Sequence, residues 1–168
     1  TPAGVEVVRV RSTRQLQEAV NERVGRADVV IMAAAVADYR PEHEAGSKLK
    51  KGSADKELST LKLVENPDVL RGVVEKRNAG ETSAVVVGFA AETDNPLEYG
   101  RAKLQRKGAD LLMVNSVAGG SVFGEATNRG WILGSDGSQT EVADGSKYEV
   151  AAQILDAVER FEARSLPS

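Results

Sequence analysis

Apolar residues occur along the chain in two patterns: short uninterrupted runs, and stretches in which they recur every three or four positions. Uninterrupted runs are typical of strands covered on both faces of a parallel sheet, whereas a spacing of three and four is typical of helices with one buried face. The runs predict buried parallel strands at residues 28–34, 84–89 and 110–114. Helices are expected between these strands and at both ends of the chain.

Polar caps mark the start of each predicted helix. A serine with Gln or Glu three positions later forms a capping box, and Asn-Pro supplies a cap followed by proline in the first turn. Capping boxes occur at Ser12 and Ser146, and Asn-Pro pairs occur at residues 66–67 and 95–96. Glycines at positions 80 and 108 are expected to end the two middle helices. The inward face of the last helix is predicted to consist of Val150, Ile154, Leu155, Val158 and Phe161.

The remaining segments predict strands and turns. Residues 5–10 predict a first strand, and residues 58–64 alternate like an exposed one, so residues 46–64 are expected to form a hairpin or flap. Residues 131–133 and 140–142 predict a hairpin that follows a long loop. The alternation of strands and helices indicates one α/β domain over residues 1–168, with a doubly wound, mostly parallel, Rossmann-like sheet and a protruding flap. Such sheets bind ligands at the carboxyl ends of their strands.

Composition narrows the classes of function. Charged residues make up 28% of the chain and hydrophobic residues 41%, with a net charge of −3, so we expect a globular protein that binds neither nucleic acid nor membrane. The longest apolar run, residues 29–37, is too short to span a bilayer. The absence of cysteine excludes disulfides and thiol chemistry and favours a reducing cytoplasmic location. His43, the single histidine, lies in a polar run and is expected to be solvated.

Small residues followed by polar ones occupy the ends of the three buried strands, at residues 32–38, 88–93 and 114–115. Small side chains let a ligand approach the backbone, but they also let helices pack tightly on a sheet, and the sequence leaves both interpretations open. Asp38 and Glu92 follow two of these ends and could hold Mg²⁺ on a phosphate-bearing ligand. Three other aspartates are expected to be solvated: Asp28, Asp110 and Asp156.

Positive charge is concentrated in two places. One cluster lies in the predicted flap (Lys48, Lys50 and Lys51), and the other lies near the end of the third helix (Arg101, Lys103, Arg106 and Lys107). Lysines can protect an edge strand, and cations can complement a helix dipole. A phosphate-rich ligand would explain both clusters together, because they flank the expected crevice. No G-x-G-x-x-G or P-loop pattern occurs, so an ordinary nicotinamide enzyme or P-loop nucleotidase is unsupported.

Six segments, in this order, resemble the phosphopantothenate–cysteine ligase family, the synthetase half of the bifunctional flavoprotein of coenzyme A biosynthesis. They cover most of the chain from about residue 27 onward: residues 33–41 (AAAVADYRP), 48–51 (KLKK), 66–70 (NPDVL), 88–93 (GFAAET), 103–107 (KLQRK) and 110–115 (DLLMVN).

The resemblance implies a two-step reaction. CTP, with Mg²⁺, activates 4′-phosphopantothenate as an acyl-cytidylate and releases pyrophosphate; cysteine then attacks, and CMP leaves. The family's catalytic lysine corresponds to Lys48, and Asp38 would approach the nucleotide or its metal ion. The other residues that the resemblance assigns to the nucleotide are Ala34, Asn66, Pro67, Asp68, Val69, Phe89, Lys103 and Lys107.

The chain departs from the family at its start. The family's domain opens with a Gly- and Ser-rich unit that nothing here matches, so the chain is expected to be the C-terminal portion of the CTP-binding domain, and the fragment's own activity is an open question. The resemblance also implies a homodimer with flap contacts, no flavin in this segment, and a higher assembly through a preceding flavin-dependent decarboxylase domain. Two other interpretations are a non-catalytic nucleotide-binding or assembly domain, and a divergent nicotinamide oxidoreductase.

Overall fold

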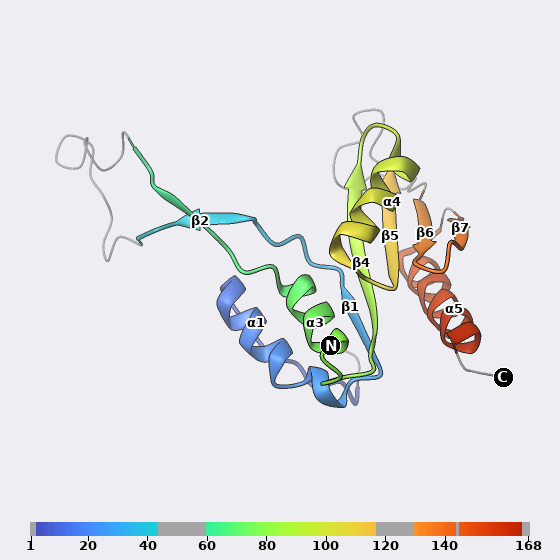
Figure 1. The fold of residues 1–168 in the computed structure, drawn as a ribbon, viewed down its shortest axis with the longest axis horizontal. Coiled ribbons are helices and arrows are strands. Elements are labelled where there is room, and N and C mark those ends of the chain that lie inside the picture. The colour runs from blue at the N-terminus through green and yellow to red at the C-terminus, as the bar shows by residue number, and fades with distance from the viewer. Residues whose placement is uncertain (1–2, 44–59, 117–129, 144, 166–168) are drawn as a thin grey trace.

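A computed structural model describes residues 3–43, 60–116, 130–143 and 145–165. Its central sheet has the strand order β1 (Val29–Met32), β4 (Val85–Glu92), β5 (Leu111–Ser116), β6 (Gly130–Gly134) and β7 (Gln139–Val142). Strands β1, β4 and β5 are parallel (Figure 1). Strand β6 pairs antiparallel with β5, and β7 pairs antiparallel with β6, so β7 again runs in the direction of β5. The predicted α/β fold with a mostly parallel sheet is confirmed.

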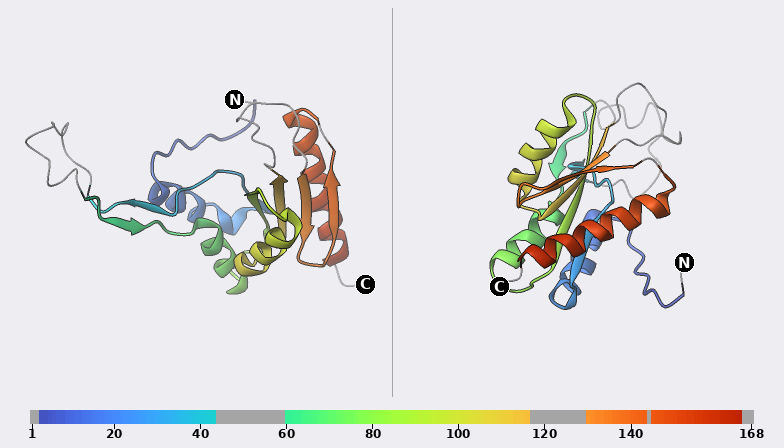
Figure 2. Two further views of the ribbon diagram at one scale, coloured as in Figure 1. Left: turned by 90° about the horizontal axis from the view of Figure 1, so that it is seen from above. Right: turned by 90° about the vertical axis from the view of Figure 1, so that its right-hand side faces the viewer.

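Helices cover both faces of this sheet. Helices α3 (Val69–Asn78) and α4 (Pro96–Lys107) lie on one face, with α1 (Thr13–Asn21) beside α3, and α5 (Lys147–Ser165) covers the opposite face (Figure 2). A short turn, η1 (Val24–Arg26), links α1 to β1. Because side chains alternate along a strand, Val86 packs in the α3–α4 core while Val87 packs in the α5 core. The sheet is therefore doubly wound, as the sequence predicts.

Three of the predicted helix starts are confirmed. Ser12 Oγ accepts a hydrogen bond from the Gln15 amide at 3.2 Å. The Ser146 amide donates to the Glu149 carboxylate at 2.6 Å, and the Glu149 amide donates to Ser146 Oγ at 3.3 Å, which completes a capping box. Helix α4 begins at Pro96 as predicted, but the Asn95 side chain makes no cap hydrogen bond; the helix ends at Gly108 with a φ of +72°. Local signals thus decide these boundaries.

The start of α3 is a correction. Asp68, and not Asn66, is the N-cap: its Oδ1 accepts a hydrogen bond from the Arg71 amide at 3.1 Å, and the helix begins at Val69. Asn66 does not cap the helix, because its side-chain oxygen accepts a hydrogen bond from Arg40 and its Nδ2 donates to the carbonyl oxygen of Ala37. A tertiary contact therefore moves the helix start by two residues.

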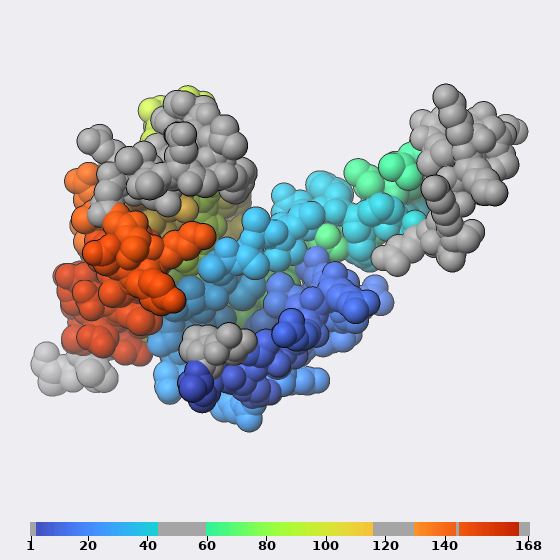
Figure 3. All heavy atoms as spheres, turned by 180° about the vertical axis from the view of Figure 1, so that it is seen from behind, coloured from blue at the N-terminus to red at the C-terminus, as the bar shows by residue number. Residues whose placement is uncertain are grey.

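Four further expectations are corrected. Residues 5–10 form no strand; they run along the surface (Figure 3), and Val5 is 56% exposed, because the described residues offer them no partner strand. Strand β1 is only partly buried: Val29 and Val30 pack against the cores on opposite faces of the sheet, but Ile31 is 40% exposed. Leu155 points outward from α5.

Asp110 is not solvated. Its carboxylate, 17% exposed, pairs with Arg77 and accepts a hydrogen bond from the Val86 amide at 2.8 Å.

A second, two-stranded sheet extends away from the main body (Figures 1 and 2). It pairs β2 (Tyr39–Pro41) antiparallel with β3 (Leu63–Glu65), and we call it the ribbon. Residues 44–59, which would form most of the predicted flap and contain Lys48, lie outside the described residues, so the flap stays a prediction. His43 is exposed, as expected. Within the described ranges, no helix is both long enough and apolar enough to cross a membrane.

Candidate functional site

A pocket of about 410 Å³ lies beyond the carboxyl end of β1. Strand β1 stops where Met32 pairs with Gly88, but β4 continues to Glu92, and this projecting part forms one wall. The loop after β1 and the first turn of α3 form the others, and α4 closes the side. The volume falls within the range of roughly 300–1,000 Å³ that is usual for small-molecule sites. The pocket therefore has the place and the size that the fold class predicts.

The structure decides between the two interpretations of the small residues separately for each position. At Gly88 a Cβ atom would lie 3.0 Å from Leu112 and 3.1 Å from Leu70, both at side-chain atoms, so this glycine serves close packing. Ala34 and Ala91 instead line the pocket and are exposed. Their small size leaves room at the pocket wall.

Two lysines of α4 reach the pocket. Lys103 and Lys107 lie one turn apart on the same helical edge, and both line the cavity. The Lys103 ammonium donates to Glu92 Oε1 at 3.4 Å, and the Lys107 ammonium pairs with Asp68. The neighbouring cations point elsewhere, since Arg101 donates to Gln139 at 3.1 Å and Arg106 is exposed and does not line the pocket. Of the four cations in the predicted cluster, Lys103 and Lys107 therefore lie at the site, and Arg101 and Arg106 lie away from it.

Asp68 joins α3 to α4 at the pocket wall. Burial disfavours its charged form, but hydrogen bonds from Lys107 and from the Arg71 amide outweigh that effect, and they hold the pKa of Asp68 below its ordinary value. The carboxylate is therefore ionised at neutral pH and keeps Lys107 in place. An anionic ligand that reaches Lys107 would compete with Asp68 for the ammonium group.

All predicted nucleotide-binding residues that the structure describes line this one pocket: Ala34, Asp38, Asn66, Pro67, Asp68, Val69, Phe89, Lys103 and Lys107. They come from four separate segments of the sequence. Lys48 falls outside the described residues. Contact between these residues and a nucleotide stays a prediction.

Sequence reasoning missed the apolar part of the pocket, where Leu70 and Leu112 lie. Neither belongs to a polar or small-residue pattern, and although both fall within segments of the family resemblance, 66–70 and 110–115, neither is among the residues that the resemblance assigns to the nucleotide. The alternation of side chains along β5 places Leu112 on the same face as Val114, in the core beneath α4, and this could have indicated its position.

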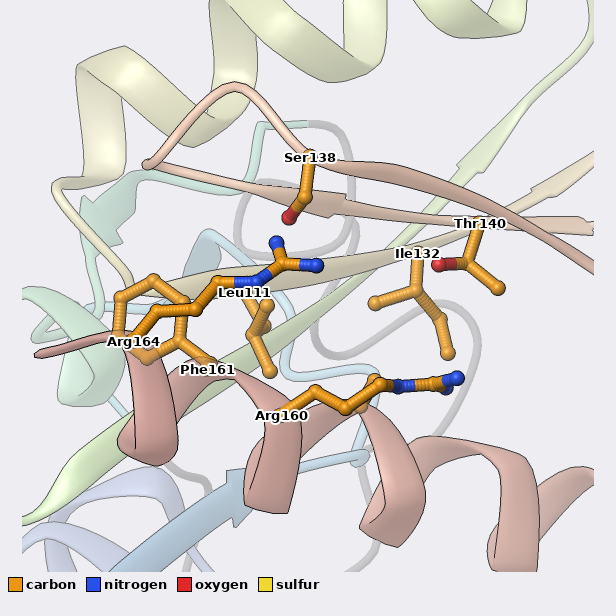
Figure 4. A pocket seen from close by; sticks show the side chains of 8 residues that line it. Leu111, Ile132, Ser138, Thr140, Arg160, Phe161 and Arg164 are labelled. Carbon is orange, nitrogen blue, oxygen red and sulfur yellow. The ribbon is translucent and has the colours of Figure 1, made fainter.

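A second cavity, between α5 and the β6–β7 hairpin, is too small for a substrate-sized ligand (Figure 4). Its volume of about 20 Å³ is close to the roughly 10–15 Å³ that one water molecule requires. Arg164 borders it but donates to Asp136 at 2.9 Å, and burial of Leu111 and Ile132 makes the floor apolar. The larger pocket is therefore the candidate site.

Comparison with known proteins identifies the family. Residues 1–161 match the model described as the DNA/pantothenate metabolism flavoprotein C-terminal domain. The chain belongs to this family.

Relatives of this C-terminal domain include the coenzyme A biosynthesis bifunctional protein CoaBC of Mycobacterium tuberculosis, which is 48% identical over 166 residues. That match covers 95% of the chain but 39% of the relative, so the chain spans well under half of that protein. A crystal structure of the C-terminal domain of CoaBC has a TM-score of 0.76 at 30% identity, over 98% of this chain and 69% of that one. A mutant of Cab2 in complex with phosphopantothenate-cysteine shares the fold, with a TM-score of 0.61 at 16% identity, over 94% of this chain and 54% of that one.

Proposed function

We propose that the pocket binds CTP and that the domain is the ligase that joins 4′-phosphopantothenate to cysteine in coenzyme A biosynthesis. The observation that carries the proposal is that two lysines and the predicted segments meet in the same pocket, in a chain of this family. The name of the mycobacterial relative and the ligand of the Cab2 complex support the same pathway and the same product.

The proposed reaction balances in two steps. A carboxylate oxygen of 4′-phosphopantothenate forms a bond to the α-phosphorus of CTP, and the bond to the bridging oxygen breaks, which releases pyrophosphate. The amine of cysteine then attacks the acyl carbon of the acyl-cytidylate, and CMP leaves as the amine loses a proton. Such chemistry depends on positioning and charge neutralisation more than on an enzyme nucleophile, which suits a chain without cysteine.

The described residues supply two kinds of phosphate recognition. The ammonium groups of Lys103 and Lys107 would exchange their carboxylate partners for phosphate oxygens, which are also anionic acceptors. The first turn of α3, where Val69 lines the pocket, presents backbone N–H groups, and helix N-termini favour anions. Lys48 is proposed to stabilise the charge that develops on the reacting phosphate, and Phe89 to pack against the nucleotide.

The pocket's donor set fits a magnesium ion that arrives with the substrate. Mg²⁺ usually binds one or two carboxylates together with substrate phosphates and water. Asp38 is an exposed carboxylate at the pocket, and it would hold the ion, which supplies charge neutralisation for the phosphates. Among the described residues, no three acidic or histidine side chains gather into a metal site, so we propose no protein-only cage.

Nucleotide titration tests the site. We expect CTP to bind the 168-residue chain by calorimetry, and Lys103→Ala and Lys107→Ala each to weaken binding by about tenfold, because each removes a charge-assisted hydrogen bond. Arg106→Ala is the matched control, since it removes a positive charge from the same helix outside the pocket and should leave affinity unchanged. Equal CTP affinity in both lysine variants would remove the proposed site, and preferential binding of NAD would support an oxidoreductase.

Turnover separates the ligase from a non-catalytic nucleotide-binding domain. We expect a form that also carries the family's Gly- and Ser-rich unit to release pyrophosphate from CTP only when 4′-phosphopantothenate is present. Binding without pyrophosphate release in that form would favour the non-catalytic alternative. We further propose a cytoplasmic homodimer, which a flavin-dependent decarboxylase domain of the parent protein could extend into a higher assembly.

A further inference from the structure

The loop after β1 is held in place by Asn66. The Asn66 amide N–H donates to the Asp38 carbonyl oxygen at 2.7 Å, and its side-chain Nδ2 donates to the Ala37 carbonyl oxygen at 2.8 Å. Ala37 and Asp38 belong to one pocket wall, and Asn66 begins the segment that forms the next. These two hydrogen bonds therefore set the spacing between two walls of the candidate site.

Arg40 fixes the orientation of that asparagine. Its NH1 group donates to Asn66 Oδ1 at 3.2 Å and to the Glu65 carbonyl oxygen at 2.6 Å. With the side-chain oxygen directed at Arg40, Nδ2 is directed at Ala37. The reverse orientation would place the NH2 group against the guanidinium and the amide oxygen against a carbonyl oxygen, so it loses both bonds. A permanently charged, planar donor group is well suited to this role.

Arg40 itself is not one of the residues around the pocket. It is half-buried in β2, opposite Val64 of β3, at the base of the ribbon. Within the described residues its guanidinium donates hydrogen bonds to Glu65 and Asn66, and of these two Asn66 lines the pocket, so Asn66 is the residue through which Arg40 can act on the site.

We propose that Arg40 is a positioning residue: through Asn66 it holds the loop after β1 against the start of α3 and so presets the pocket for its ligand. The ligand's identity rests on the function proposed above, but the preset geometry does not. A pocket that is already formed binds more tightly than one whose walls must be ordered on binding. The proposal also revises the expected role of Asn66, whose side chain serves the pocket wall.

A double-mutant cycle on nucleotide affinity tests this coupling. We expect Arg40→Gln and Asn66→Ala each to weaken CTP binding by about tenfold, and the double variant to be no weaker than either single one, because both act on one contact. Arg40→Lys keeps one donor group and should restore part of the affinity. Arg71→Gln is the control, because Arg71 is an exposed arginine at the same end of α3 whose guanidinium pairs with Glu75.

Hydrogen exchange supplies a readout that does not need the ligand. In Arg40→Gln the Asn66 amide should exchange at least tenfold faster, because its hydrogen bond to the Asp38 carbonyl oxygen opens more often. The amides of β4 and β5 should keep their protection, because the main sheet is unchanged. If the unaltered chain binds no CTP, the proposed function fails and hydrogen exchange alone decides on Arg40. Unchanged exchange at Asn66, or losses of affinity that add in the double variant, would overturn the positioning role; if Arg40→Gln does not fold, Arg40→Lys and Asn66→Ala give the same test.

Discussion

At the scale of single residues, Asp68 combines two tasks that are usually separate. One carboxylate oxygen caps α3 through the Arg71 amide, and the other pairs with Lys107 of α4. The cap needs only a short side chain with a hydrogen-bond acceptor, whereas the ion pair needs a negative charge. The two tasks can therefore be separated by substitution.

Asparagine caps a helix as well as aspartate does, so Asp68→Asn should keep most of the stability of α3 and lose the ion pair. Asp68→Ala loses both and should lower the free energy of unfolding by about 1 kcal/mol. Urea unfolding at neutral pH measures the difference. Equal losses in the two variants would show that the cap contributes nothing.

The same position predicts a dependence on pH. Because the pKa of Asp68 is lowered in the folded chain, its ionised form stabilises the fold above the unfolded-state pKa of about 3.9, and this stabilisation disappears as the pH falls through the folded-state value. The gap in stability between the unaltered chain and Asp68→Asn should accordingly be present at neutral pH and close below about pH 4. A gap that does not change with pH would contradict the ion-pair assignment.

At the scale of elements, two glycines in helices that border the site have opposite surroundings. At Gly100 of α4 a Cβ atom would lie 2.7 Å from Val114 Cγ2 and 2.9 Å from Leu133 Cδ1, and both neighbours are fully buried. At Gly72 of α3 nothing lies within 4 Å. Helix α4 therefore needs its glycine to approach the sheet, and α3 does not.

We expect Gly72→Ala to stabilise the chain by about 0.5–1 kcal/mol, which is the gain in helix propensity. Gly100→Ala gains the same propensity but overpacks the core, which typically costs about 1–3 kcal/mol, so the net effect should be destabilising by about 1 kcal/mol. Thermal and urea unfolding of the two variants decide the matter. A stabilised Gly100→Ala chain would mean that α4 can move away from the sheet.

The elements that the sequence predicts well are those whose signals are local. The serine caps at Ser12 and Ser146 act within one turn and appear as expected; the full capping box forms at Ser146, whereas at the other helix Gln15 Oε1 accepts the Arg11 amide. Residues 5–10 have the right composition for a strand, but a strand also needs a partner, and composition does not supply one. Asn66 has the right chemistry for a cap, but Arg40, which is distant in the sequence, donates to its side-chain oxygen.

The candidate site also has parts that local sequence signals predict and parts that depend on distant contacts. Its place at the strand ends follows from the fold class, so its wall residues could be predicted. The pairing of Lys107 with Asp68 joins positions 39 apart in the chain, and the contact of Arg40 with Asn66 joins positions 26 apart. Such contacts depend on how α3, α4 and the ribbon pack, and no local pattern encodes them.

At the scale of the whole molecule, the ribbon leaves apolar side chains uncovered on one face, where the Glu65 carboxylate lies beside Tyr39. Tyr39, Leu61 and Leu63 are 54%, 65% and 54% exposed. Tyr39 and Leu63 share a face of the ribbon, because Leu63 lies opposite Pro41 and side chains alternate along each strand; Leu61 lies two residues before Leu63. An isolated two-stranded sheet is marginally stable in water, and exposed apolar patches mark contact surfaces. Both facts favour the homodimer proposed above, with the ribbon as its contact surface.

We therefore expect the chain to have twice its monomer mass of 17.9 kDa by sedimentation in solution. A Leu61→Lys/Leu63→Lys variant should have the mass of the monomer, because each subunit would bury two positive charges in the interface. Leu155→Lys is the matched control: Leu155 is 51% exposed, but it lies on α5, which packs against β6 and β7 away from the ribbon (Figure 1), and should leave the dimer intact. A monomeric mass for the unaltered chain at micromolar concentration would contradict the dimer. Dissociation by Leu155→Lys, with the ribbon variant still dimeric, would instead place the contact surface on α5.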